Sequence, residues 1–189
     1  IKCRFAGLKP SAVVIVATIR ALKMHGGLQK TELSTPNCQA LEKGFENLKT
    51  HIENIGKFGL PVVVAAINKF ITDSDEEIEL LQKLCKENGT TAILSEGWEK
   101  GGNGTTELAK EVVKTCEEKQ ANFKPLYDLE LPIVDKIKKL ATEIYRASNV
   151  EIDSAALRKI KMFEEQGYGN LPICVAKTQN SISHDPKLI

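Results

Sequence analysis

Four short apolar runs most restrict the fold that this chain can adopt. They cover residues 12–18 (AVVIVAT), 61–68 (PVVVAAIN), 91–95 (TAILS) and 171–176 (LPICVA). Each run contains β-branched residues and lacks the alternation of polar and apolar side chains that a half-exposed strand shows. Strands covered on both faces, as in parallel sheets, have such sequences. The pattern therefore predicts four buried parallel strands.

Amphipathic helical patterns separate the first three strands. Apolar side chains recur at spacings of three and four in residues 39–57, 75–88 and 105–119. Strands that alternate with helices in this way are typical of a doubly wound, mostly parallel α/β sheet. We therefore expect residues 1–119 to form part of one α/β domain.

The pattern changes after Gln120. Two consecutive amphipathic helices are predicted over residues 132–145 and 153–166. We expect residues 120–170 to form a helical annex. Residues 171–189 would then return to the sheet as a strand and a polar loop.

The composition excludes several classes of protein. The 189 residues include 26 Lys and Arg and 25 Asp and Glu, giving a net charge of +1. This balance gives no electrostatic reason to expect nucleic-acid or membrane binding, and no apolar stretch approaches the roughly 20 residues of a membrane-spanning helix. The five cysteines are widely spaced and form no CxxC pair, so we expect reduced thiols in a cytoplasmic protein without a metal site.

Polar residues follow the predicted strands, where open α/β sheets bind their ligands. Arg20, Lys23 and His25 follow the first strand and precede a Gly pair, and Lys177 and Ser181 follow the fourth. Arg and Lys could hold phosphate or carboxylate groups. The alternative is that these segments are ordinary polar surface loops.

Aromatic residues follow the second and third strands. Phe70 comes just after Asn68 at the end of the second strand, and Trp98, the single Trp, lies in a Gly-rich segment after the third. Two such rings could stack on a flat heterocycle, each stack contributing roughly 0.5–1.5 kcal/mol. The alternative for Phe70 is packing beneath the next helix. Asn68-Lys69 also invites comparison with the guanine-reading NKxD motif, but position 71 is Ile and the acid is Asp73, so that match fails.

Several long segments resemble one family, the formate–tetrahydrofolate ligases. The segment VATIRALKMHGG (16–27) is similar to a signature of that family, and so are HIENIGKFGLPVVVAAINKF (51–70), LSEGWEKGG (94–102) and GYGNLPICVAKTQNSIS (167–183). The resemblance spans essentially the whole chain. Because members of the family are about three times longer, it implies an internal fragment of a larger multidomain enzyme.

The resemblance implies a P-loop NTPase-like sheet and an ATP-dependent reaction. ATP, with Mg²⁺, would phosphorylate formate, and tetrahydrofolate would attack the formyl phosphate to give 10-formyltetrahydrofolate. It also implies that Phe70 and Trp98 sandwich the pterin of tetrahydrofolate, that Leu94 lines the same pocket, and that the whole enzyme is a homo-oligomer.

This sequence departs from the family in three respects. Ile71 stands where the family usually has Pro, and no GxxxxGK[ST] phosphate loop occurs in the chain. The family's Gly- and Met-rich C-terminal segment is also absent. We therefore expect the 189 residues by themselves to be inactive, because phosphoryl transfer depends on positioned phosphate ligands. The catalytic residues stay undefined, and a folate- or nucleotide-binding module without synthetase activity is the alternative.

Overall fold

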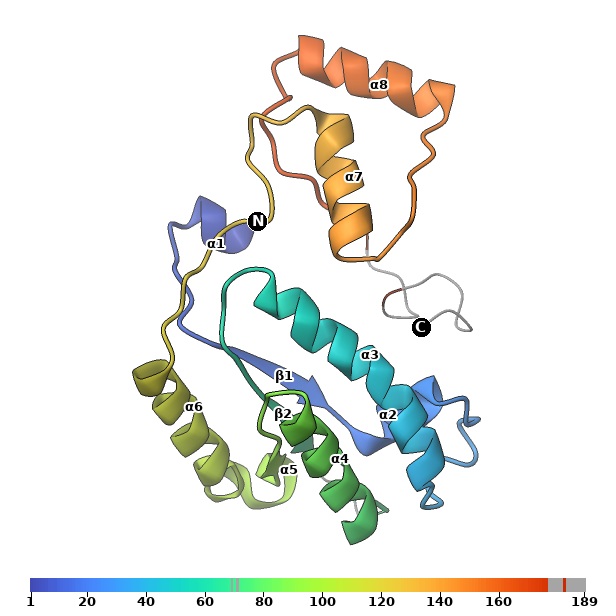
Figure 1. Cartoon of the computed structure of the whole chain (residues 1–189), viewed down its shortest axis with the longest axis vertical. Coiled ribbons are helices and arrows are strands. Elements are labelled where there is room, and N and C mark those ends of the chain that lie inside the picture. The colour runs from blue at the N-terminus through green and yellow to red at the C-terminus, as the bar shows by residue number, and fades with distance from the viewer. Residues whose placement is uncertain (69, 71, 177–181, 183–189) are drawn as a thin grey trace. The chain divides into compact units, whose positions relative to one another are not determined.

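The computed structural model describes residues 1–68, 70, 72–176 and 182 (Figure 1). The described chain divides into two compact units. One unit is Pro10–Phe123, and the other combines Ile1–Lys9 with the described residues that follow Phe123.

A three-stranded parallel sheet forms the centre of the Pro10–Phe123 unit. Its strands are β1 (Val13–Ala17), β2 (Val62–Asn68) and β3 (Ile93–Ser95), in the order β1-β2-β3. Both pairings are parallel, and the register shifts between Val14 and Ile15. The three strands predicted first along the chain are thus confirmed, and so is their parallel direction.

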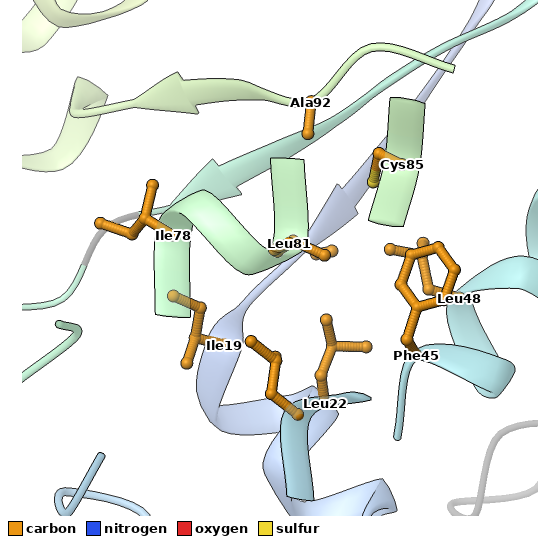
Figure 2. Packing of buried hydrophobic residues seen from close by; sticks show 10 residues of the cluster. Ile19, Leu22, Phe45, Leu48, Ile78, Leu81, Cys85 and Ala92 are labelled. Carbon is orange, nitrogen blue, oxygen red and sulfur yellow. The ribbon is translucent and has the colours of Figure 1, made fainter. Parts of the chain in front are cut away.

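Three helices build a core against this sheet. They are α2 (Ile19–His25), α3 (Cys38–Gly56) and α4 (Asp75–Glu87). Figure 2 shows their buried side chains converging in one cluster with Ala92, which precedes β3. The cluster comprises Ala17, Ile19, Leu22, Leu41, Phe45, Leu48, Ile78, Leu81, Cys85 and Ala92. The apolar stripes predicted for α3 and α4 supply most of these residues.

Two glycines let α2 and α3 approach at backbone distance. A Cβ atom on Gly44 would lie 1.8 Å from the carbonyl oxygen of Leu22, and one on Gly26 would lie 1.9 Å from that of Ala40. Any side chain at either position would force the helices apart. This close crossing fixes α2 directly beyond the end of β1.

Three further segments follow β3. They are α5 (Gly97–Lys100), the 3₁₀ segment η1 (Gly101–Thr105) and α6 (Thr106–Glu118), and α6 contacts β2 and β3. One face of β1 is nevertheless open within the described residues, where Val16 is 63% exposed and Val14 is also exposed. The expectation that every strand is covered on both faces is therefore wrong for β1, because the helices of the core cluster cover only the face that carries Ile15 and Ala17.

The second unit is helical. It contains α1 (Lys2–Phe5), α7 (Ile133–Glu143) and α8 (Ser154–Glu165). Glu164 joins the two longer helices by accepting a hydrogen bond of 2.9 Å from the first amide of α7, that of Ile133. Arg4 donates a hydrogen bond to the Tyr127 carbonyl and lies 5.4 Å from the centre of the Tyr127 ring. The two predicted helices of residues 132–145 and 153–166 are confirmed.

The predicted fourth strand is wrong, since residues 171–176 form no strand in the structure. Side chains bond to the backbone in and just before this segment. The Ile173 amide donates to the hydroxyl of Tyr127 at 2.9 Å, and the Lys136 ammonium donates to the carbonyls of Gly169 at 2.5 Å and Leu171 at 3.2 Å. Pro172 has no amide hydrogen to offer a ladder. The expected return of this segment to the sheet stays a prediction.

Candidate functional site

The loops after β2 and β3 begin side by side at the carboxyl edge of the sheet. Asn68, the last residue of β2, pairs with Ser95, the last residue of β3. Phe70 follows the first of these by two residues and Trp98 follows the second by three. Because the two strands are parallel and their last residues pair, the loops that carry Phe70 and Trp98 begin next to each other.

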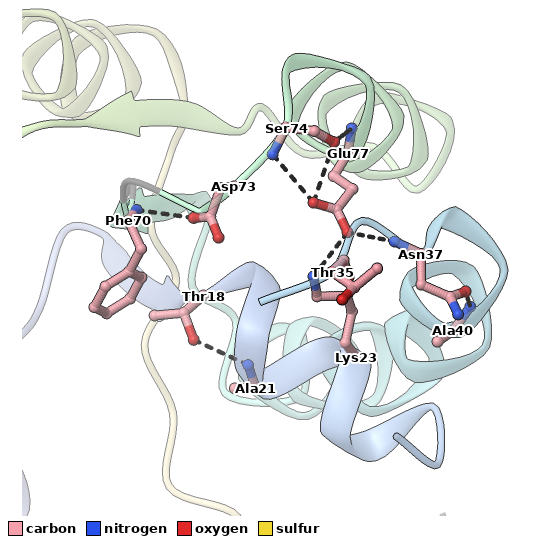
Figure 3. Close-up of polar contacts among 10 residues, drawn as sticks. All are labelled: Thr18, Ala21, Lys23, Thr35, Asn37, Ala40, Phe70, Asp73, Ser74 and Glu77. Atoms are coloured by element: carbon pink, nitrogen blue, oxygen red, sulfur yellow. Dashed lines mark hydrogen bonds and ion pairs between the residues drawn. The ribbon is translucent and has the colours of Figure 1, made fainter. Parts of the chain in front are cut away.

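Asp73 and Ser74 shape the loop after β2 (Figure 3). One carboxylate oxygen of Asp73 accepts a hydrogen bond of 2.8 Å from the Phe70 amide. Ser74 caps α4, because its hydroxyl accepts from the Glu77 amide while the Glu77 carboxylate accepts from the Ser74 amide. This capping box begins α4 directly after Asp73 and so ends the segment that carries Phe70.

The Phe70 ring is only partly covered. It is 42% exposed, and the guanidinium carbon of Arg20 lies 5.5 Å from the ring centre. Arg20 reaches it from the first turn of α2, whose N-cap is Thr18. A cation over an aromatic ring is favourable by about 0.5–1 kcal/mol at exposed sites. The alternative in which Phe70 packs beneath the next helix is not what the structure shows.

Trp98 stands on a tightly closed loop. The Glu96 amide donates to the Gly104 carbonyl at 3.1 Å, which closes residues 96–104. Gly104 lies so close to this junction that a Cβ atom there would meet the Glu96 carbonyl oxygen at 2.4 Å. Gly101 has a φ of +56°, a conformation that favours glycine. The loop therefore has a defined shape that presents the indole.

The Trp98 side chain is 98% exposed. A side chain this exposed contacts almost nothing in the described chain, so Trp98 does not stack on Phe70. Neither ring is buried, and both loops start from paired strand ends. The arrangement leaves each ring with apolar surface available to a flat ligand.

The other predicted site residues have different surroundings. Lys23 is fully buried, and its ammonium pairs with Glu77 at 2.9 Å and donates to the Thr35 carbonyl at 3.0 Å. Leu94 is partly buried and packs against the core cluster. His25 ends α2, and burial lowers its pKa. The structure therefore assigns Lys23 a role in the interior and not in a surface loop.

The side chains of three predicted site residues are not described. Lys177 and Ser181 fall outside the described residues, and of Asn68 only the backbone is described. Among the described residues, no group of His, Cys, Asp or Glu could hold a metal ion.

The sequence did not lead us to predict that Asp73 and Glu77 hold the segments at the carboxyl edge of the sheet in place. Glu77 is fully buried and accepts from the amide of Asn37 at 2.8 Å as well as from Lys23 and Ser74. Burial raises its pKa, but these hydrogen bonds and the Lys23 charge outweigh burial and lower the pKa overall. The available signal was the Ser74-x-x-Glu77 spacing of a capping box.

Comparison with known proteins identifies the family. The model of the family described as formate–tetrahydrofolate ligase matches residues 1–189. The chain belongs to this family. A curated formate–tetrahydrofolate ligase from Granulibacter bethesdensis is 53% identical over 188 residues, which cover 100% of this chain and 33% of that relative.

This member of the formate–tetrahydrofolate ligase family thus spans about a third of the length of the curated relative that it matches. That coverage agrees with the expectation of a part of a longer enzyme. Within the described ranges, no helix is both long and apolar enough to cross a membrane. The cytoplasmic location stays a prediction.

Proposed function

We propose that this chain supplies the pterin-binding edge of an ATP-dependent ligase that joins formate to tetrahydrofolate. The product would be 10-formyltetrahydrofolate, formed through formyl phosphate in one-carbon metabolism. Family membership supports the reaction. The bare Trp98 ring, on a closed loop beside the Phe70 loop, is the observation that carries the assignment of the pterin.

The proposed binding mode is a sandwich. A pterin is flat and aromatic, so it would gain stacking on two faces, each worth roughly 0.5–1.5 kcal/mol beyond the area buried. Phe70 would cover one face of the pterin with the side of its own ring that Arg20 leaves open, and Trp98 would cover the other face. Leu94, at the end of β3, would add apolar surface next to the core.

In this account the chain contributes orientation and water exclusion to the reaction. Holding the attacking amine of tetrahydrofolate in place converts an encounter in solution into a reaction within one complex. Two aromatic rings also remove water from around the reacting group. ATP supplies phosphoryl activation of formate when it is bound, and that chemistry needs ligands from elsewhere in the whole enzyme.

Three finer features belong to the same proposal. The three-stranded sheet would be part of a doubly wound, P-loop NTPase-like sheet, the whole enzyme would be a homo-oligomer, and its substrates would be small molecules only. The 189 residues alone would have no formyl-transfer activity, because they lack a GxxxxGK[ST] phosphate loop. Formation of 10-formyltetrahydrofolate by the 189-residue chain would contradict this expectation.

The pterin assignment is tested by calorimetric binding of tetrahydrofolate and ATP to the full-length natural chain that carries these residues. Trp98→Ala and Phe70→Ala should each weaken tetrahydrofolate binding about 10-fold or more and leave ATP binding within about 2-fold. The control is Phe163→Ala, since Phe163 in α8 is also 42% exposed. Equal losses for both ligands, or a loss as large in the control, would remove the assignment. A full-length chain that binds tetrahydrofolate through Trp98 but forms no product would be a binding module only.

A further inference from the structure

The loop after β2 carries two buried polar atoms without a hydrogen-bond partner. They are the hydroxyl oxygen of Thr72 and the Oδ1 atom of Asp73, and neither has a partner in the part of the chain that the structure describes. Asp73 is only 7% exposed. A buried polar atom left unpaired is unfavourable for folding, so two of them in adjacent residues need an explanation.

The neighbouring positive charges do not pair with these two atoms. Lys23 forms its ion pair with Glu77, and Arg20 lies over the Phe70 ring. Burial raises the pKa of Asp73, an effect that Glu77 reinforces and that the Phe70 amide and the charges of Lys23 and Arg20 only partly oppose. The carboxylate thus uses Oδ2 to hold the Phe70 amide, while its buried Oδ1 stays unpaired among the described residues; Figure 3 shows Asp73 beside Phe70.

We propose that Oδ1 of Asp73 accepts a hydrogen bond from the amino-pyrimidine edge of the ring stacked on Phe70, with the Thr72 hydroxyl as its companion. This proposal rests on the pterin function proposed above and adds the residue that reads the ring. One edge of a pterin carries a 2-amino group and an N3–H, both donors, beside a 4-oxo acceptor. A carboxylate oxygen accepts only, while a hydroxyl also donates, so the two atoms complement that edge.

The same edge occurs in guanine, which gives the chemistry two sources. Asp73 stands five residues after Asn68, two positions later than the acid of the guanine-reading motif. Its loop also presents Phe70 to the ligand. We assign the edge to a pterin, because the exposed Trp98 ring is available to cover the second face of the ligand. The test therefore includes a guanine nucleotide.

The experiment compares folate with its 2-desamino analogue, in which hydrogen replaces the amino group, by calorimetry on the full-length chain. The wild type should bind folate about 10- to 100-fold more tightly, as expected for a hydrogen bond to a charged acceptor. Asp73→Asn should reduce this ratio to within about 3-fold of unity. The side-chain oxygen of Asn would still accept from the backbone N–H of Phe70, and its NH₂ group, which only donates, would then face the ligand. Thr72→Val should weaken both compounds equally. The control is Asp75→Asn, which removes the same charge from an exposed position two residues away and should leave the ratio unchanged.

Each outcome has a distinct meaning. A wild type that binds both compounds equally refutes the role of Asp73 even if no variant folds. A variant Asp73→Asn that keeps the wild-type ratio also refutes it and leaves the sandwich intact. A wild type that binds neither compound refutes the pterin function and this inference together. GTP that displaces folate and loses affinity in Asp73→Asn would show that the edge reads guanine, which overturns the assignment to a pterin.

Discussion

The buried ion pair between Lys23 and Glu77 should be the most sensitive point of the fold. It joins α2 to α4, and both side chains are fully buried. Lys23→Met removes one donor to Glu77, whose carboxylate still accepts from the amides of Asn37 and Ser74. Glu77→Leu instead leaves the buried Lys23 ammonium with the Thr35 carbonyl as its one partner among the described residues, and it leaves the amides of Asn37 and Ser74 without their acceptor.

These contacts predict which of the two variants loses more free energy of unfolding, and about how much each loses. Breaking a buried pair by removing one partner costs about 3–5 kcal/mol. Lys23→Met should fall near the lower limit, because Glu77 keeps its other hydrogen bonds. Glu77→Leu should reach the upper limit or exceed it. Each backbone amide that loses its acceptor and stays buried adds about 1–3 kcal/mol to the loss of stability.

Equilibrium urea unfolding of the 189-residue chain, followed by circular dichroism, measures both free energies. The control is Lys110→Met, which breaks an exposed pair with Glu107 at 2.6 Å and should change stability by less than about 0.5 kcal/mol. A loss below about 1 kcal/mol in Lys23→Met would refute the reasoning. So would a larger loss in Lys23→Met than in Glu77→Leu.

Three further predictions follow from the same structure. Gly44→Ala should destabilise the chain by about 1–3 kcal/mol in urea unfolding, because its Cβ would meet the Leu22 carbonyl, whereas Gly56→Ala in the same helix meets nothing and should be neutral or stabilising. Gly104→Ala should distort the Trp98 loop and weaken tetrahydrofolate binding several-fold, while Gly102→Ala, which has open space, should not; equal affinities would contradict this. Ionised Glu77 should stabilise the fold above its ordinary pKa of 4.5, and because its pKa is lowered this contribution should disappear as the pH falls below that value. Urea midpoints between pH 3 and 7 should show that loss in the wild type and not in Glu77→Gln.

The sequence was sufficient to predict the parts of the fold that depend on local pattern. The first three strands and the longer helices follow from apolar runs and stripes, because burial and period are encoded in neighbouring residues. Cys85 and Leu81, for example, lie in a predicted stripe and are fully buried. The parallel direction follows from the intervening helices.

Features that depend on distant partners could not be predicted. The segment 18–27 is basic, so it resembled a surface loop, yet the Thr18 cap makes it a helix and Glu77, far along the chain, draws Lys23 inside. Residues 171–176 are as apolar as a strand, but the side chains of Tyr127 and Lys136 bond to the Ile173 amide and the Leu171 carbonyl instead. Neither contact has a signal in the local sequence.

The candidate site was predictable in its residue types but not in its geometry. Phe70 and Trp98 are predicted site residues because they follow apolar strands, and the pairing of Asn68 with Ser95 explains why their loops begin together. The contact of Arg20 with Phe70 and the unpaired oxygen of Asp73 depend on how α2 and the β2 loop are held. Such contacts are properties of the folded chain.

A crystal structure of the full-length chain with tetrahydrofolate bound tests the central claim most directly. The account predicts the pterin between the rings of Phe70 and Trp98, with each ring centre about 4.5–7 Å from the centre of the pterin. A pterin bound away from this edge, or a Trp98 ring still surrounded by solvent in the complex, would contradict it.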